Sequence, residues 1–148
     1  MGRQAFLYLS LIVGGALVAV PAEGGDAPAD QKPLEGKWLL VSSEQEGVSK
    51  PAEELKGGGT YMIFENQEVI ARSEDQSVSL GTYSLDPSKS PSWYNRVMPD
   101  GTERLGIYRI EGDQLFLCLG ERGKTRPSEF RTTKEDKASL VIYKRVKE

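Results

Sequence analysis

The clearest hydrophobic pattern in the chain consists of two short runs separated by a polar turn. Residues 105–110 and 114–119 are rich in β-forming side chains, and Gly112-Asp113 between them suits a two-residue turn with a positive φ. Strand side chains alternate between two faces, and both faces of these runs carry apolar groups. The pattern predicts a central hairpin that is covered on both sides.

Similar short runs recur along the chain, with turn-forming residues between them and one expected helical turn at 51–55. About eight or nine short strands with almost no helix predict an all-β fold. Short successive connections favour a single antiparallel up-and-down barrel of about eight strands, which can be filled by side chains or hold one small ligand. The remaining expected strands are 36–43, 60–65, 68–73, 78–85, 92–98, 129–132 and 140–145.

The N-terminal segment has the pattern of an export signal. An apolar stretch at 5–20 follows Arg3, and small residues precede a cleavage point after Ala22, so 1–22 is expected to be a signal peptide. An uncleaved membrane anchor is the alternative, although the stretch is short for a span. Residues 23–33 are rich in Gly, Pro and acids and are expected to form a flexible leader, which leaves 34–148 as the folded domain. We therefore expect an extracytoplasmic protein, periplasmic or secreted, that does not stay in the membrane after cleavage.

The composition removes several classes of function. The 148 residues carry a net charge of −3, with no histidine and one cysteine. A chain without a basic excess is poorly suited to nucleic acid. Without histidine it lacks the commonest general base and metal ligand, and one cysteine builds neither an internal disulfide nor a thiolate cluster. We expect no metal and no cofactor, and catalysis would depend on Asp, Glu, Lys or Tyr.

Motifs in order across 34–145 resemble a domain family found in many copies in planctomycete bacteria, often behind a signal peptide. The matching residues are Leu34-x-Gly36-x-Trp38, Gly81-Thr82-Tyr83, Gly106-Ile107-Tyr108, Gly112-Asp113-x-Leu115, Leu117-Cys118 and Arg126-Pro127-x-x-Phe130. The family is regarded as lipocalin-like and has no established activity. The resemblance implies a tryptophan, Trp38, that closes one end of the barrel and packs on an arginine of the last strand, for which Arg145 is the candidate. It implies no catalytic residue.

Candidate ligand-binding residues are aromatic and cationic. Aromatic side chains can line a cavity or simply fill a small barrel. The basic side chains near 122–131 can form an anion clamp or a loop held by salt bridges. The candidates are Tyr61, Tyr83, Trp93, Tyr108, Arg126 and Arg131.

Other residues of the shared motifs are expected to be structural. Cys118 lies among leucines and is expected to be buried, although nearby cations leave a reactive thiolate as the alternative. Pro127 is expected to set a turn and Phe130 to enter the core. The remaining structural candidates are Gly36, Trp38, Gly106, Gly112, Asp113 and Arg145.

These features favour an exported, non-enzymatic, lipocalin-like domain that binds a small apolar or amphipathic ligand. The alternative is a module of the cell envelope that recognises protein or glycan, with a barrel filled by side chains. An apolar cavity favours the first function, and an exposed aromatic patch over a filled interior favours the second.

Overall fold

The chain forms a closed antiparallel barrel with one additional strand outside it. The computed structural model describes residues 29–55 and 59–147, so the expected signal peptide at 1–22 lies outside the described residues. The elements are η2 (Ala29–Leu34), β2 (Gly36–Gln45), β3 (Val48–Pro51), η3 (Ala52–Glu54), β4 (Tyr61–Glu65), β5 (Glu68–Arg72), β6 (Ser77–Asp86), β7 (Ser92–Val97), β8 (Glu103–Glu111), β9 (Gln114–Leu119) and β10 (Ser139–Arg145).

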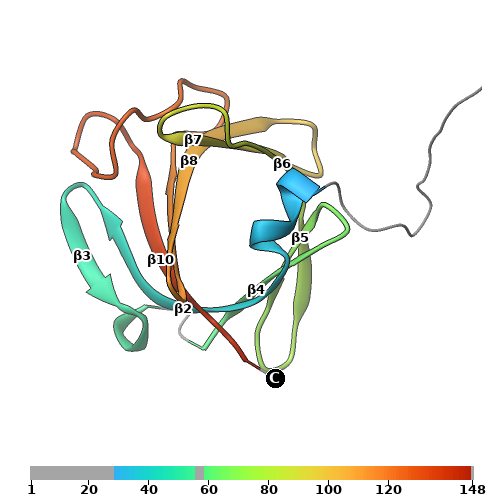
Figure 1. The fold of residues 1–148 in the computed structure, drawn as a ribbon. Coiled ribbons are helices and arrows are strands. Elements are labelled where there is room, and N and C mark those ends of the chain that lie inside the picture. Colours follow the sequence, from blue (N-terminus) through green and yellow to red (C-terminus); the bar gives the residue numbers. More distant parts are fainter. Residues whose placement is uncertain (1–28, 56–58, 148) are drawn as a thin grey trace, which may run out of the picture.

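Apart from β3, successive strands pair in chain order, and the last strand closes the ring by pairing with β2 (Figure 1). The sheet has nine strands, and the eight other than β3 form the barrel. Closure leaves these strands without a free edge. The predicted all-β barrel is therefore confirmed, and the helical content of the described residues is the two 3₁₀ turns, η2 and η3.

Two strand predictions are wrong. Strand β3 was not predicted, and it pairs with the second half of β2, on the side where β4 pairs with the first half. Residues 129–132 were predicted as a strand, but they form no ladder. Phe130 instead packs against the outside of the barrel, so its burial comes from docking and not from strand pairing.

The hairpin of β8 and β9 is covered on both faces, as its pattern predicts. Leu115 and Leu117 belong to a large inner cluster, whereas Ile107 and Cys118 belong to a small outer cluster. The connection between β9 and β10 covers this outer cluster, and Phe130 is part of the cover.

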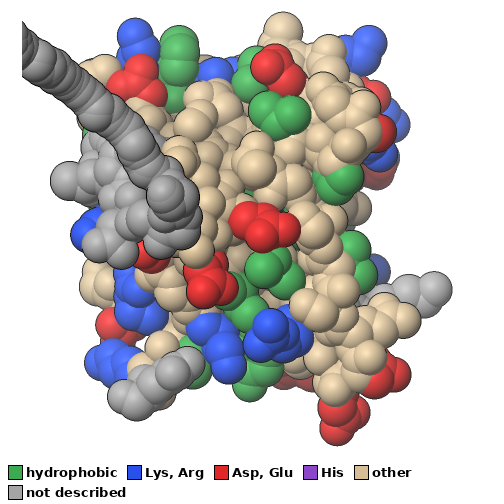
Figure 2. Space-filling model, turned by 90° about the vertical axis from the view of Figure 1, so that its right-hand side faces the viewer, with side chains coloured by type: hydrophobic (Ala, Val, Ile, Leu, Met, Phe, Trp, Pro, Cys, Tyr) green, Lys and Arg blue, Asp and Glu red, His purple; other side chains and the backbone are tan. Residues whose placement is uncertain are grey.

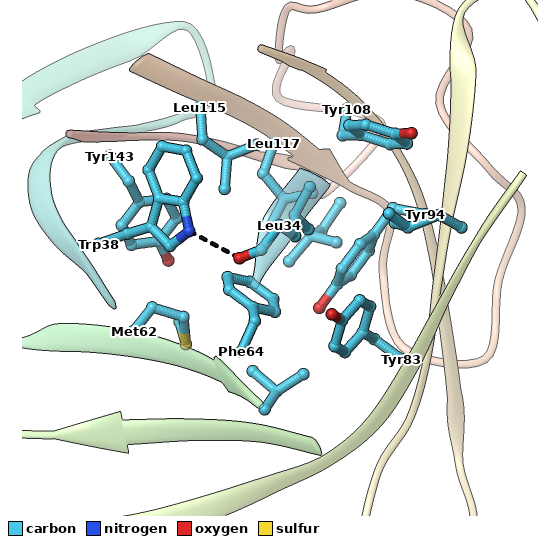
Figure 3. Close-up of a cluster of buried hydrophobic side chains, with 13 residues drawn as sticks. Leu34, Trp38, Met62, Phe64, Tyr83, Tyr94, Tyr108, Leu115, Leu117 and Tyr143 are labelled. Atoms are coloured by element: carbon cyan, nitrogen blue, oxygen red, sulfur yellow. Dashed lines mark hydrogen bonds between the residues drawn. The ribbon is translucent and has the colours of Figure 1, made fainter. Parts of the chain in front are cut away.

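The inner cluster occupies the barrel interior (Figure 3). Phe64 meets Tyr83 edge to face with ring centroids 5.0 Å apart, and Tyr83 stacks on Tyr94 at 6.1 Å. Such aromatic pairs add about 0.5–1.5 kcal/mol beyond their burial. The buried members are Leu34, Trp38, Met62, Phe64, Val69, Tyr83, Leu85, Tyr94, Tyr108, Leu115, Leu117, Leu119 and Tyr143.

Candidate functional site

One end of the barrel is plugged by the first described residues. Element η2 lies inside the ring of strands in Figure 1, and Leu34 and Trp38 are fully buried. Trp38 Nε1 donates a 2.9 Å hydrogen bond to the Leu34 carbonyl (Figure 3). The Arg145 guanidinium lies 4.1 Å from the Trp38 ring centroid and donates to the carbonyls of Glu35 and Pro33 at 3.1 and 2.9 Å. The expected contact of Trp38 with Arg145 is present, and we call this region the plugged end.

Secondary structure in the described residues begins before Leu34. Residues 29–33, which their composition assigns to the flexible leader, form most of η2. The physical reason is local, because Arg145 binds the Pro33 carbonyl and Leu34 is enclosed by the inner cluster.

The opposite end, which we call the open end, exposes an apolar side chain on the inner face of the sheet. Val78 on β6 is the cross-strand partner of Ala71 on β5. Cross-strand partners point to the same side, and Ala71 packs against the inner cluster. Val78 therefore faces inward, yet 50% of it is exposed. An inward side chain is exposed to this extent only where the barrel is open.

The β2–β3 hairpin extends this inner face. Val48 pairs with Gln45, whose Nε2 lies 3.3 Å from the hydroxyl of Ser139 on β10, and Val48 is 58% exposed. A recess of about 370 Å³ lies against the hairpin. Its lining mixes apolar, polar and charged groups: Ser43, Gln45, Glu46, Val48, Lys50 and Leu55.

Arg96 is a charged side chain buried on the inner face of β7, next to the open end. It is 4% exposed, and its Nε donates to the Tyr94 hydroxyl at 3.2 Å. Within residues 29–55 and 59–147, no carboxylate forms a salt bridge with Arg96, and neither Nη makes a hydrogen bond. A buried guanidinium without an acidic partner is costly, so its presence requires an explanation.

A second arginine, Arg104 on β8, is the cross-strand partner of Arg96. Its Nε donates to the Gly120 carbonyl at 2.7 Å, and its Nη2 lies 3.3 Å from the Ser139 hydroxyl. Burial, followed by repulsion from Arg96 and Arg122, lowers the pKa of Arg104. The open end therefore brings two guanidinium groups together beside neutral acceptors.

Two phenols lie near these cations. Burial raises the pKa of Tyr94, and it also raises the pKa of Tyr143, while the charge of Arg96 acts in the opposite direction on both. Both hydroxyls therefore keep their protons at neutral pH. Guanidinium N–H and phenol O–H groups are all donors, so the arrangement is suited to an anion.

The structure places the predicted ligand-binding aromatics on both sides of the barrel wall. Tyr83 and Tyr108 belong to the inner cluster. Trp93 packs against the outer cluster, with the Arg126 guanidinium 4.0 Å from its ring centroid. Tyr61 points to the outside of β4, because the next residue along the strand faces the inner cluster. The four rings are not brought together in one cavity.

The predicted cations Arg126 and Arg131 lie outside the barrel. Arg126 donates to the carbonyls of Tyr94 and Gly106 at 3.2 and 2.8 Å, and so bridges β7 and β8. Arg131 is exposed and forms a 2.8 Å salt bridge with Glu129. Both line a recess of about 260 Å³, together with Pro127.

The remaining motif residues lie in the wall and its turns. Cys118 is fully buried, its Sγ lies 3.7 Å from the Arg131 carbonyl, and burial raises the pKa of its thiol to about 11. A Cβ on Gly106 would lie 2.5 Å from the Cys118 carbonyl, so the close pairing of β8 and β9 requires glycine.

The turn residues of the hairpin and of the plugged end also have contacts that explain them. Gly112 has a φ of 59° in the two-residue turn, as predicted, and the Asp113 carbonyl accepts from the Arg145 amide at 2.7 Å. A Cβ on Gly36 would lie 3.2 Å from Nη1 of Arg145.

Sequence reasoning missed Arg96 and Arg104. The available signal was the alternation along 92–97, which places Arg96 on the same face as Tyr94. Whether that face points inward depends on the register of the closed barrel, which the alternation does not determine.

A scan of protein-family models and searches of curated proteins and of solved structures found no match to this chain. The resemblance to the planctomycete family therefore stays a prediction. Across residues 29–55 and 59–147 there is no group of three or more Cys, Asp or Glu side chains placed to hold a metal ion. No helix in that part of the chain is long and apolar enough to cross a membrane. On the side of the barrel shown in Figure 2, acidic and basic side chains are interspersed.

Proposed function

We propose that this chain is an exported lipocalin-like barrel that binds a small apolar or amphipathic ligand at its open end and catalyses no reaction. The observation that carries the proposal is the difference between the two ends. Trp38 and Arg145 seal the plugged end, whereas Val48 and Val78 remain exposed on the inner face at the other. Apolar surface turned toward a recess is typical of a ligand site.

The titratable groups around Arg96 are cations and protonated phenols, and none of them is poised as a base near neutral pH. Export rests on the pattern of residues 1–22, and the lipocalin-like character rests on the barrel together with the motif resemblance.

A neutral fluorescent probe, N-phenyl-1-naphthylamine, tests the proposal in titrations of the purified protein expressed from the full-length chain. We expect saturable binding that Val78→Glu weakens about tenfold or more, because a carboxylate on the inner face must be desolvated beside the probe. Val97→Glu is the matched control, since Val97 is 42% exposed at the same end but alternates with the inward Arg96 and so faces outward. Absence of saturable probe binding would contradict the proposal.

The second candidate, a cell-envelope interaction module, is favoured by one observation. The largest fully buried side chains include Trp38, Tyr94 and Phe64, which occupy much of the interior. If no probe binds, and native mass spectrometry of gently purified protein shows only the bare chain, the interaction module becomes the better account.

A further inference from the structure

We propose that Arg96 and Arg104 form a site for the anionic headgroup, carboxylate or phosphate, of a single-chain amphiphile. This inference rests on the proposed function and specifies the ligand class of the same open end. It starts from two guanidinium groups on facing positions of β7 and β8, with no acid bonded to either among the described residues.

The Nη atoms of Arg96 are the donors on which this inference depends. Among the described residues, the buried side-chain polar atom without any hydrogen-bond partner is Glu35 Oε2. Arg96 Nη1 and Nη2 also make no hydrogen bond to residues 29–55 and 59–147. This buried cation therefore keeps two donor groups without a partner among the described residues.

The neighbouring groups hold the guanidinium in position without neutralising it. The Tyr94 hydroxyl accepts from Nε of Arg96, which fixes the plane of the guanidinium and leaves both Nη groups for a ligand. Arg104 is held in the same way by the Gly120 carbonyl and the Ser139 hydroxyl. Planar guanidinium groups bind carboxylate and phosphate with paired hydrogen bonds.

The acids of this end do not substitute for a ligand. Glu103 pairs across strands with Val97, which faces outward, so it points away from Arg96. Glu46 lines the recess, and so does a further cation, Lys50. Neither of these two acids forms a salt bridge with Arg96 or Arg104 among the described residues.

The rim accounts for the apolar part of the ligand. Inward-facing Val78 and the exposed Val48 lie at the end of the strands beyond Arg96. The interior on the other side of Arg96 is occupied by Tyr94, Tyr83 and Phe64. In the bound ligand, the headgroup is therefore expected at the arginines, and its alkyl chain is expected to lie along the valines toward solvent.

The test is displacement of N-phenyl-1-naphthylamine by dodecanoate, monododecyl phosphate and methyl dodecanoate, which share one alkyl chain. We expect at least one of the two anions to bind about tenfold or more tightly than the neutral ester. Which anion it is distinguishes the carboxylate from the phosphate. Arg96→Met is expected to remove this preference while the ester still binds.

Arg122→Met is the matched control, because Arg122 lies near Arg104 but is exposed and paired with Asp100 at 2.9 Å. It removes the same charge and is expected to keep the preference. Arg104→Met is the second test variant if Arg96→Met fails to fold.

Three results would overturn the inference. If the ester and both anions bind equally tightly, and the probe alone also binds, the headgroup site is refuted but the proposed function is not. If Arg96→Met and Arg122→Met lose the preference for anions over the ester equally, general surface charge and not the headgroup site causes that preference. Failure of the probe and of all three amphiphiles to bind refutes the headgroup site and the proposed function together.

Discussion

The two ends of the barrel use arginine in different ways. At the plugged end, Arg145 lies on the Trp38 ring and donates to two backbone carbonyls. At the open end, Arg96 is 4% exposed, and within the described residues its side chain makes one hydrogen bond, to the hydroxyl of Tyr94. Both Nη groups of Arg145 donate to carbonyls, whereas Arg96 contacts Tyr94 and leaves both Nη groups without a hydrogen bond among the described residues. Hydrogen-bond partners, more than depth of burial, therefore distinguish the two arginines, and this difference is the reason for proposing Arg96 as the ligand-binding one.

The largest effect is expected at the plugged end. Trp38→Ala should lower the free energy of unfolding by about 3–5 kcal/mol, because a fully buried indole leaves a cavity. Trp93→Ala is the matched control, since Trp93 is only partly buried on the outer wall and should cost less than half as much. Urea unfolding measures both, and equal losses would contradict the special role of the plug.

Alkaline pH should weaken the barrel through its buried phenols. Burial raises the folded-state pKa of Tyr83, Tyr94 and Tyr143 above the usual value near 10. As the pH rises above about 10, each of these phenols therefore loses its proton in the unfolded chain while it still keeps the proton in the folded chain. Stability is complete below about pH 10 and falls above it by up to about 1.4 kcal/mol per pH unit for each phenol. Tyr143→Phe should reduce this slope in urea unfolding between pH 9 and 11, and an unchanged slope would refute the assignment.

A smaller effect is expected for the structural arginine. Arg145→Met removes the contact with Trp38 and two hydrogen bonds to carbonyls of the N-terminal segment. We expect a loss of about 1–2 kcal/mol in urea unfolding, together with faster hydrogen exchange of the Glu35 amide, which bonds to the Lys32 carbonyl in η2. Unchanged exchange there would show that Arg145 does not hold the plug.

The smallest effect on stability is expected for Arg96. Arg96→Met should change the free energy of unfolding by less than about 0.5 kcal/mol or increase it, because methionine avoids the cost of burying an unpaired charge. Thermal and urea unfolding of Arg96→Met beside Arg145→Met give the comparison directly. A loss from Arg96→Met as large as that from Arg145→Met would mean that both arginines are structural.

Much of the fold follows from local patterns, because alternation and turn chemistry act over a few residues. The β8–β9 hairpin is an example, with its Gly112-Asp113 turn and two covered faces. Strand β3 escaped prediction because Val48–Pro51 carries one large apolar side chain and a proline. Phe130 suggested a strand, but its burial comes from packing on the outer cluster.

The site was harder to predict because it depends on register between strands. Ladder irregularities at Val69/Ile70 and at Ile142/Tyr143 shift which side chains point inward. The basic cluster at Arg126 was visible in the sequence, yet Arg96 and Arg104 meet only because β7 and β8 pair in this register. Sequence spacing alone contains no such information.

The most direct test of the two-ended account is an amide chemical-shift titration of the protein with neutral N-phenyl-1-naphthylamine. The account predicts that the largest shifts occur at the open end, at Gln45, Val78 and Arg96, and that Gly36 and Asp113 at the plugged end stay unchanged. Shifts concentrated at the plugged end or on the outer wall around Arg126 would contradict it, and so would the absence of shifts at saturating probe.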